Sequence, residues 1–159
     1  MPVSSSTNAN ADVRKRLKIW YDSPYRFVTQ ALGVEPEEWQ KKAMLAIKNN
    51  DHVAVKSGHG VGKSALESWI ILWWLLTRYP AKVACTAPTG HQLSDVLWGE
   101  IAKWYRKLPP GLKSLLAVKN DRVELVSAPS ESFAVARTAR KETPEAFQGF
   151  HSENMLFMV

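Results

Sequence analysis

Cysteine and long hydrophobic runs are what this 159-residue sequence has least of. Its single cysteine, Cys85, excludes an internal disulfide and leaves no cluster of thiolates for a metal ion, so we expect a small buried side chain there. The longest apolar run, residues 69–76, is far too short to span a bilayer. Residues 1–12 are rich in Ser, Asn and Ala and lack the apolar stretch of a signal peptide, which predicts a disordered tail. These absences together predict a soluble intracellular protein without a membrane partner.

What the sequence does contain is enough apolar material for one domain and an excess of positive charge. Hydrophobic residues make up 45% of the chain and aromatic residues 10%, which suffices for a single core. The formal net charge of +6 is typical of a protein that handles a polyanion, but also of an ordinary basic surface. The basic cluster in residues 14–18 has the same two interpretations, contact with DNA phosphate or exposed charge on a short helix.

Hydrophobic periodicity and turn residues divide the chain into helices and strands. Residues 13–34 form a predicted N-terminal helical segment that breaks at Pro24 and ends at Gly33, and an amphipathic helix follows that ends at residues 49–51. Predicted strands cover residues 53–56, 82–87, 115–119, 122–126, 132–137 and 155–159. This order predicts an α/β fold with helices flanking the sheet, and the uniformly apolar last strand is typical of the buried centre of a sheet.

The two longest predicted helices differ in their patterns. Residues 63–79 are apolar on almost every side, so this helix must be buried nearly all round. In the helix over residues 90–108, by contrast, the apolar side chains share one face, as in a helix that covers a sheet. That face carries Leu93, Val96, Leu97, Ile101, Trp104 and Leu108.

A glycine-rich segment connects the first predicted strand to the helix over residues 63–79. Its eight residues, all candidates for nucleotide binding, are Ser57-Gly58-His59-Gly60-Val61-Gly62-Lys63-Ser64. Glycines let backbone N–H groups curl around phosphate oxygens, and the helix N-terminus that follows favours anions, so the segment predicts a P-loop. Lys63 would reach the β- and γ-phosphates, and the Ser64 hydroxyl would ligate Mg²⁺. The strict pattern has Gly where this chain has Ser57, His59 is expected to be a spacer, and the alternative is a glycine-rich turn with an incidental lysine.

Two further features lie on either side of this loop. Gln40, in a Trp-Gln pair ahead of the loop, offers both a donor and an acceptor and would pair with the edge of adenine. Behind the loop, Thr86-Ala87-Pro88-Thr89 ends a predicted strand where α/β sheets place their ligand loops. These features predict ATP, with Mg²⁺, as the ligand.

The order of these motifs, continued by residues 134–139 and by Gln148-Gly149-Phe150-His151 ahead of the last apolar strand, resembles the large terminase subunit of tailed bacteriophages. The resemblance covers about residues 13–159. It implies a RecA-like (ASCE) P-loop ATPase domain, followed by a ribonuclease H-like nuclease, that packages double-stranded DNA into a procapsid. It also implies a homo-oligomeric ring, the portal protein and the small terminase subunit as partners, and the cytoplasm of a bacterium whose phage or prophage encodes the protein.

The resemblance implies roles for individual residues as well. Lys63 and Ser64 match the Walker A lysine and serine, and Gln40 matches the adenine-side glutamine. Thr86 and Thr89 match a loop near DNA or the coupling path. Arg137 and Arg140 are candidates for the arginine that stabilises charge on the transferring phosphoryl group of a neighbouring subunit, and the alternative is a surface pair.

On this interpretation residues 35–159 are a partial ATPase domain. Magnesium-binding acids normally end a buried strand, and we expect Asp-Glu to follow Val159 in a longer parent protein, with the rest of the ATPase domain and the nuclease beyond. The isolated chain would then bind nucleotide with little or no turnover, whereas the parent would be an ATPase. A superfamily 2 helicase-like DNA translocase and a nucleotide-binding module without turnover are the alternatives.

Overall fold

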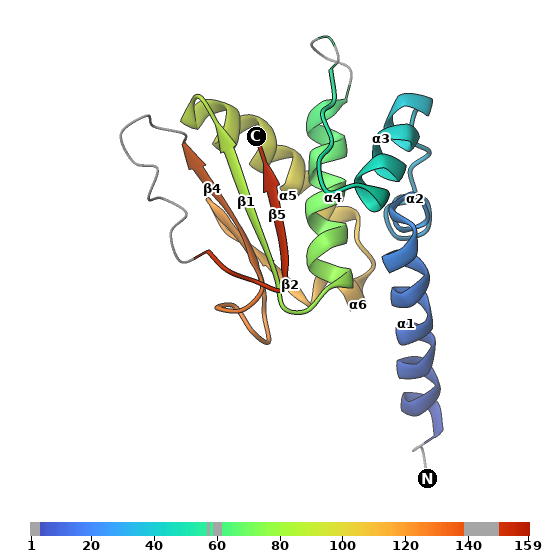
Figure 1. Ribbon diagram of the computed structural model, residues 1–159. Helices are drawn as coiled ribbons and strands as arrows, with labels where there is room; N and C mark the ends of the chain where they lie inside the picture. The colour runs from blue at the N-terminus through green and yellow to red at the C-terminus, as the bar shows by residue number, and fades with distance from the viewer. Residues whose placement is uncertain (1–3, 57, 59–61, 139–149) are drawn as a thin grey trace.

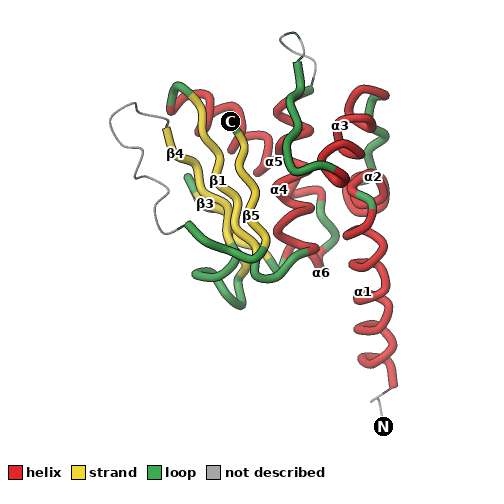
Figure 2. Tube along the Cα trace, in the orientation of Figure 1, coloured by secondary structure: helices red, strands yellow, loops and turns green. Residues whose placement is uncertain are grey.

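The computed structural model describes residues 4–56, 58, 62–138 and 150–159, and it is a mixed α/β structure built on one open sheet (Figures 1 and 2). The strands are β1 (Ala81–Ala87), β2 (Leu116–Val118), β3 (Arg122–Leu125), β4 (Phe133–Thr138) and β5 (Asn154–Met158). Their order in the sheet is β2-β3-β4-β1-β5. Strands β4, β1 and β5 run parallel, and β2 and β3 add an antiparallel hairpin at one side. The predicted strands from residue 82 onward are therefore confirmed.

Helices and short helical turns make up the rest of the described chain. They are α1 (Ser4–Asp22), α2 (Pro24–Phe27), η1 (Val28–Leu32), α3 (Glu38–Asn49), α4 (Lys63–Thr77), η2 (Gln92–Leu97), α5 (Trp98–Lys107) and α6 (Pro110–Lys113), where η marks a π-helical turn. As predicted, Gly33 ends the N-terminal segment, because its φ of 68° is in the left-handed region that favours glycine. Ser23 caps α2 by accepting a hydrogen bond from the backbone N–H of Arg26 at 3.2 Å.

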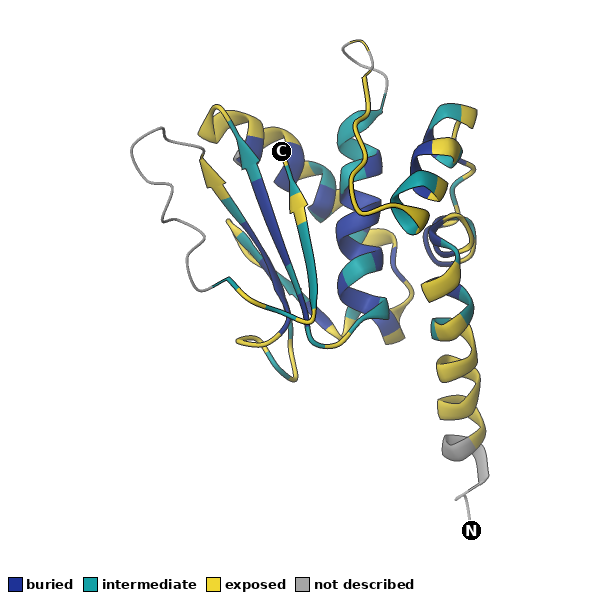
Figure 3. Cartoon of the chain, viewed as in Figure 1, coloured by how far each residue is buried: buried dark blue, intermediate teal, exposed yellow. Residues whose placement is uncertain are grey.

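Helix α4 is the centre of the hydrophobic core, which confirms the prediction from its apolar sequence (Figure 3). On one side it packs against the sheet, where Val83 and Cys85 of β1 are completely or almost completely buried. On the other side the N-terminal helices cover it, and the indole Nε1 of Trp73 donates a 2.6 Å hydrogen bond to the backbone oxygen of Trp20. Burial raises the pKa of the Cys85 thiol to about 12, so this cysteine is the inert core side chain that its context predicts.

The N-terminal tail differs from the prediction. From Ser4 onward the residues expected to be disordered lie in α1, which contains no Gly or Pro up to Asp22 and continues through the basic cluster as one helix. Residues 8–16 are exposed throughout, so this part of α1 extends beyond the core (Figures 1 and 3). Composition signals the lack of a core contact at residues 8–16, but these residues continue a helix whose C-terminal end is anchored in the core through Trp20.

The predicted helix over residues 90–108 exists, but its first half is π-helical. The wider turn η2 places Leu93 and Trp98, five residues apart, in the core together with Leu97. Val96, which a uniform α-helix would place on the core face, is 45% exposed instead. A single π-helical segment therefore changes which residues face the sheet.

Two linked predictions about strands were wrong. Residues 52–56 form no strand, although Val53 and Val55 alternate with more polar neighbours, and both valines are about 40% exposed. Strand β5 lies at the edge of the described sheet, with Phe157 54% exposed, and is not its buried centre. A cavity of about 480 Å³ lies between these two segments. Strand pairing depends on a partner at hydrogen-bonding distance, which alternation along the sequence does not supply.

Candidate functional site

The candidate site lies where α4 begins, beside the carboxyl ends of the parallel strands β1 and β5. A cavity of about 1,020 Å³ is lined there by Gly62, Lys63 and Ser64 from the start of α4, by Thr86 from β1 and by Met158 from β5. Small-molecule sites usually measure about 300–1,000 Å³, and in open α/β sheets they lie at the carboxyl ends of the strands. The structure thus brings three residues of the glycine-rich loop together with Thr86 in one cavity large enough for a nucleotide.

The backbone at the start of α4 is suited to an anion. Gly62 is the N-cap of the helix, with a φ of 84° that is strained for any residue with a Cβ. Helix α4 is 15 residues long, and its first-turn N–H groups have no partner within the helix, so the helix dipole and these donors favour negative charge at this end. Lys63 and Ser64 lie in this first turn and are half-buried. The arrangement supplies a positive side chain, a hydroxyl and backbone donors around one point.

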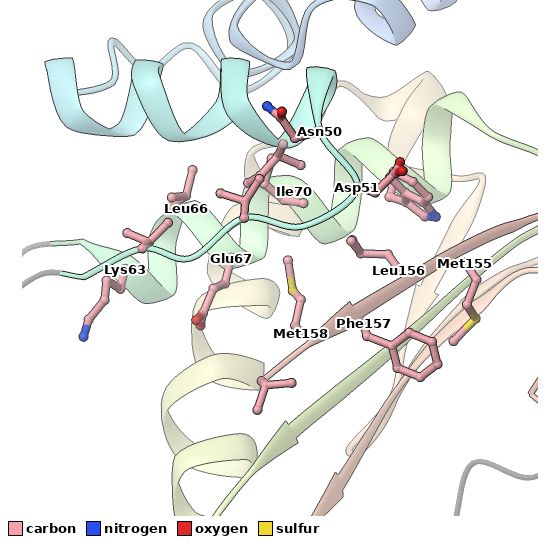
Figure 4. Close-up of a pocket in the computed structure, with 15 residues that line it drawn as sticks. Asn50, Asp51, Lys63, Leu66, Glu67, Ile70, Met155, Leu156, Phe157 and Met158 are labelled. Carbon is pink, nitrogen blue, oxygen red and sulfur yellow. The ribbon is translucent and has the colours of Figure 1, made fainter.

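Glu67 is a residue of the site that the sequence analysis missed. It lies one turn after Lys63 on the same side of α4, and both side chains line the 480 Å³ cavity (Figure 4) as well as the 1,020 Å³ cavity. Burial raises the pKa of the Glu67 carboxyl, and the positive charge of Lys63 partly opposes this effect. The signal was present in the sequence, because Glu67 is the only charged residue between Lys63 and Thr77 in an otherwise apolar helix.

Gln40 lies beside the glycine-rich loop, but its amide is engaged by the backbone. It is only 5% exposed, its Oε1 accepts a hydrogen bond from the N–H of Glu37 at 2.8 Å, and its Nε2 donates to the carbonyl oxygen of Gly62 at 3.2 Å. These two contacts use one of the two donor hydrogens of Nε2 and one of the two lone pairs of Oε1. The pairing of Gln40 with adenine stays a prediction, whereas its link to Gly62 is present in the structure.

The threonines of the loop after β1 have separate local roles. The hydroxyl of Thr86 donates to the carbonyl oxygen of Met158 at 3.4 Å and so connects the ends of β1 and β5. Thr89 is exposed, and its Oγ1 accepts a hydrogen bond from the N–H of Gln92 at 3.3 Å at the start of the next helix. Only Thr86 lines the large cavity.

Two described candidates, Arg137 and Gly58, line neither cavity. Arg137 is exposed near the end of β4, level with Thr86 of β1, and it is not among the residues that line either cavity. Gly58 is exposed and lies in neither a helix nor a strand. The remaining candidates Ser57, His59, Gly60, Val61 and Arg140 lie outside the described residues.

The described residues fit a nucleotide with its Mg²⁺ better than a metal held by protein alone. The cavity combines the glycine N-cap, a lysine and a hydroxyl, which are donors for phosphate and one ligand for a hard cation. Within residues 4–56, 58, 62–138 and 150–159, no group of three or more His, Cys, Asp or Glu side chains is placed to hold a metal ion. Nor does this part of the chain contain a helix with the length and apolar character needed to cross a membrane.

Comparison of the sequence with protein-family models and with curated proteins gives no match. The site described above therefore rests on its own geometry and chemistry.

Proposed function

We propose that this chain is the nucleotide-binding part of an ATP-driven motor that moves double-stranded DNA, as in the large terminase subunits that its motifs resemble. The single observation that carries the proposal is the position of Gly62, Lys63 and Ser64. They begin a long buried helix at the carboxyl end of parallel strands, inside a cavity of about 1,020 Å³. This arrangement supports a RecA-like P-loop assignment for the α/β fold.

In this proposal each residue of the site has one task. The positive charge of Lys63 holds the β- and γ-phosphates, and the N–H groups of the first turn of α4 bind phosphate oxygens. The Ser64 hydroxyl contributes one ligand to Mg²⁺, which when bound neutralises charge on the phosphates. Gln40 keeps Gly62 in place through the 3.2 Å hydrogen bond to its carbonyl oxygen, and this fixes the backbone position of the adjacent Lys63 at the cavity.

The wider assembly follows the same proposal. A DNA-packaging motor works as a homo-oligomeric ring in the host cytoplasm with the portal protein and the small terminase subunit, and each subunit can present an arginine to its neighbour's nucleotide. Arg137 suits that task because it is exposed at the same end of the sheet as Thr86. Arg140 is the second candidate for this task.

Nucleotide binding tests the core of the proposal. Titration of a fluorescent ATP analogue into the chain with Mg²⁺ should show saturable binding, and Lys63→Ala should weaken it at least tenfold because the phosphates lose their main positive partner. Lys42→Ala is the matched control, since Lys42 is exposed on α3 and lines neither cavity. Equal binding by Lys63→Ala and the control would overturn the proposal.

Turnover and DNA dependence then separate the possible functions. Tight ATP binding together with DNA-stimulated hydrolysis is expected for the packaging motor. Strand separation would assign the site to a helicase-like translocase. Binding without hydrolysis under any of these conditions would indicate a nucleotide-binding module.

A further inference from the structure

Much of α1 is exposed to solvent. Residues 8–16 are all exposed, and this part of the helix extends beyond the core along the side of the molecule (Figures 1 and 3). Isolated helical segments of this length are marginally stable in water. The described structure therefore presents a surface whose order would increase when something binds to it.

The C-terminal end of α1 is firmly attached, so the exposed part has a fixed direction. Trp20 is buried, its indole donates to Oε1 of Gln30 at 2.9 Å, and its backbone oxygen accepts the hydrogen bond from Trp73 of α4. Trp20 also packs edge-on against Phe27. The side chains that precede this anchor on α1 are consequently held at set positions relative to the core.

These side chains are basic and polar, not apolar. Helix α1 has a formal net charge of +2. It contains four basic residues (Arg14, Lys15, Arg16 and Lys18) and two acidic residues (Asp12 and Asp22). Residues 8–16 include no large apolar side chain other than Val13, so the helix offers no apolar stripe to a membrane or to a second helix. The chemistry of this surface is complementary to that of a polyanion.

One stripe of α1 continues onto the rest of the molecule. Arg14, Lys18 and Tyr21 are spaced i, i+4, i+7 and so share a helix face. The Tyr21 ring is also contacted by Lys48 of α3, with Nζ 5.0 Å from the ring centroid, and by the guanidinium of Arg78, at 4.4 Å. We call these five residues the basic strip.

We propose that the basic strip binds the phosphate backbone of duplex DNA. Arginine and lysine side chains along a helix neutralise successive phosphates and release the counterions bound there, which gives affinity without sequence readout. A single strand fits less well, since base stacking needs a free aromatic face and two cations already contact the Tyr21 ring. The choice of DNA as the polyanion rests on the proposed function, but the strip shares no residue with the nucleotide cavities.

The test is fluorescence anisotropy of a short labelled duplex titrated with the full 159-residue chain at several salt concentrations. Affinity should fall steeply as salt rises. The double variant Arg14→Gln/Lys18→Gln should bind roughly tenfold more weakly, with a salt slope lower in magnitude by about 2, because each lost phosphate contact removes about 0.9. Both side chains are exposed, so the fold should be preserved.

The matched control is Lys15→Gln/Arg16→Gln, which removes the same charge from other faces of the same helix. It should lose clearly less affinity than the strip variant. Equal losses in the two variants, no salt dependence, or binding to anionic vesicles or heparin but not to the duplex would each overturn the proposal. Lys63→Ala should bind the duplex normally and the strip variant should bind ATP normally, so failure of the strip and failure of the nucleotide site are distinguishable.

Discussion

Nε2 of Gln40 donates a hydrogen bond to the carbonyl oxygen of Gly62 at 3.2 Å and thereby joins two positions 22 residues apart. The contact is close, because a Cβ placed on Gly62 would lie 2.9 Å from the same Nε2 atom. The other end of the amide accepts from the N–H of Glu37 at the start of α3. One buried side chain thus fixes the beginning of α3 and the residue ahead of Lys63 at the same time.

We therefore expect changes at Gln40 to weaken nucleotide binding without regard to the base. Gln40→Ala removes two part-buried hydrogen bonds to the backbone, which should cost about 1–3 kcal/mol in the free energy of unfolding at about 0.5–1.5 kcal/mol each. Gln40→Glu keeps the acceptor for Glu37 but places a second oxygen against the Gly62 carbonyl. Urea unfolding measures the loss of stability, and titrations with ATP and GTP measure the loss of nucleotide affinity.

The two nucleotides distinguish the possible roles of Gln40. If the residue positions the loop, both variants should lose affinity for ATP and GTP by the same factor. A loss confined to ATP would instead show that the amide pairs with adenine. Asn49→Ala is a suitable control, because it is an exposed amide at the other end of α3.

Glu67 should make the folded protein more stable at mildly acidic pH than at neutral pH. Its pKa in the folded state is raised above the ordinary value of 4.5, mainly by burial. Between that value and the raised pKa the folded state binds more protons than the unfolded state, so this contribution to stability falls as pH rises through the interval. Glu67→Gln should remove the effect and be more stable than the parent at pH 7.

Urea midpoints at about pH 5 and pH 7 for the parent and for Glu67→Gln check this expectation. The difference between the two proteins should be larger at neutral pH, since only the parent then holds a buried charge. The same difference at both pH values would contradict it. The variant should also bind ATP more tightly, because a negative charge beside Lys63 and the phosphates is removed.

Arg78 should stabilise the contact between α1 and α4. Its guanidinium carbon lies 4.0 Å from the Trp74 ring centroid, 4.2 Å from that of Trp73 and 4.4 Å from that of Tyr21. We expect Arg78→Ala to lower the free energy of unfolding by about 1–2 kcal/mol, and Arg78→Lys to lose part of this, because an ammonium group does not stack as a plane. Arg26→Ala, an exposed arginine on α2, should change stability little in the same urea measurement.

Two buried tryptophans offer a matched comparison of a satisfied and an unsatisfied indole. Nε1 of Trp73 donates to the Trp20 backbone oxygen at 2.6 Å, whereas Nε1 of Trp98 is buried with no hydrogen-bond partner among the described residues. Trp73→Phe should therefore destabilise the protein by about 0.5–1.5 kcal/mol more than Trp98→Phe, because only the former loses a buried hydrogen bond. The Trp20 oxygen keeps its second bond, from the backbone N–H of Ser23 at 3.2 Å. If both substitutions lower the free energy of unfolding equally, in thermal or urea unfolding, the lost side-chain volume accounts for both effects.

The fold was predictable where the local sequence pattern alone determines which residues are buried and where a helix or strand ends. The glycine at position 33, the uniformly apolar helix α4 and the strands β1 to β4 each follow from periodicity and turn residues. The π-helical turn η2 did not, because its geometry depends on how Leu93 and Trp98 fit beside α4 and the sheet. The absence of a strand at Val53 and the edge position of β5 likewise depend on distant neighbours.

The candidate site was predictable in part for the same reason. Lys63, Ser64 and Thr86 were identified from motif order, and the structure places them around one cavity. Glu67 was not predicted because no motif includes it. A single charged residue in an apolar helix nevertheless indicates that this part of the helix borders a cavity or solvent. The contact of Gln40 with Gly62 could not be predicted from the sequence, because the two residues belong to separate elements whose relative position is known only from the structure.

The edge position of β5 has a practical consequence for handling the protein. Among the described residues β5 pairs with no strand other than β1, and it borders the 480 Å³ cavity, next to the exposed side chain of Phe157. Such an edge is a template for an extended segment from another molecule. Concentrated samples should therefore associate through added strands, so light scattering across a dilution series belongs with every affinity measured on this chain.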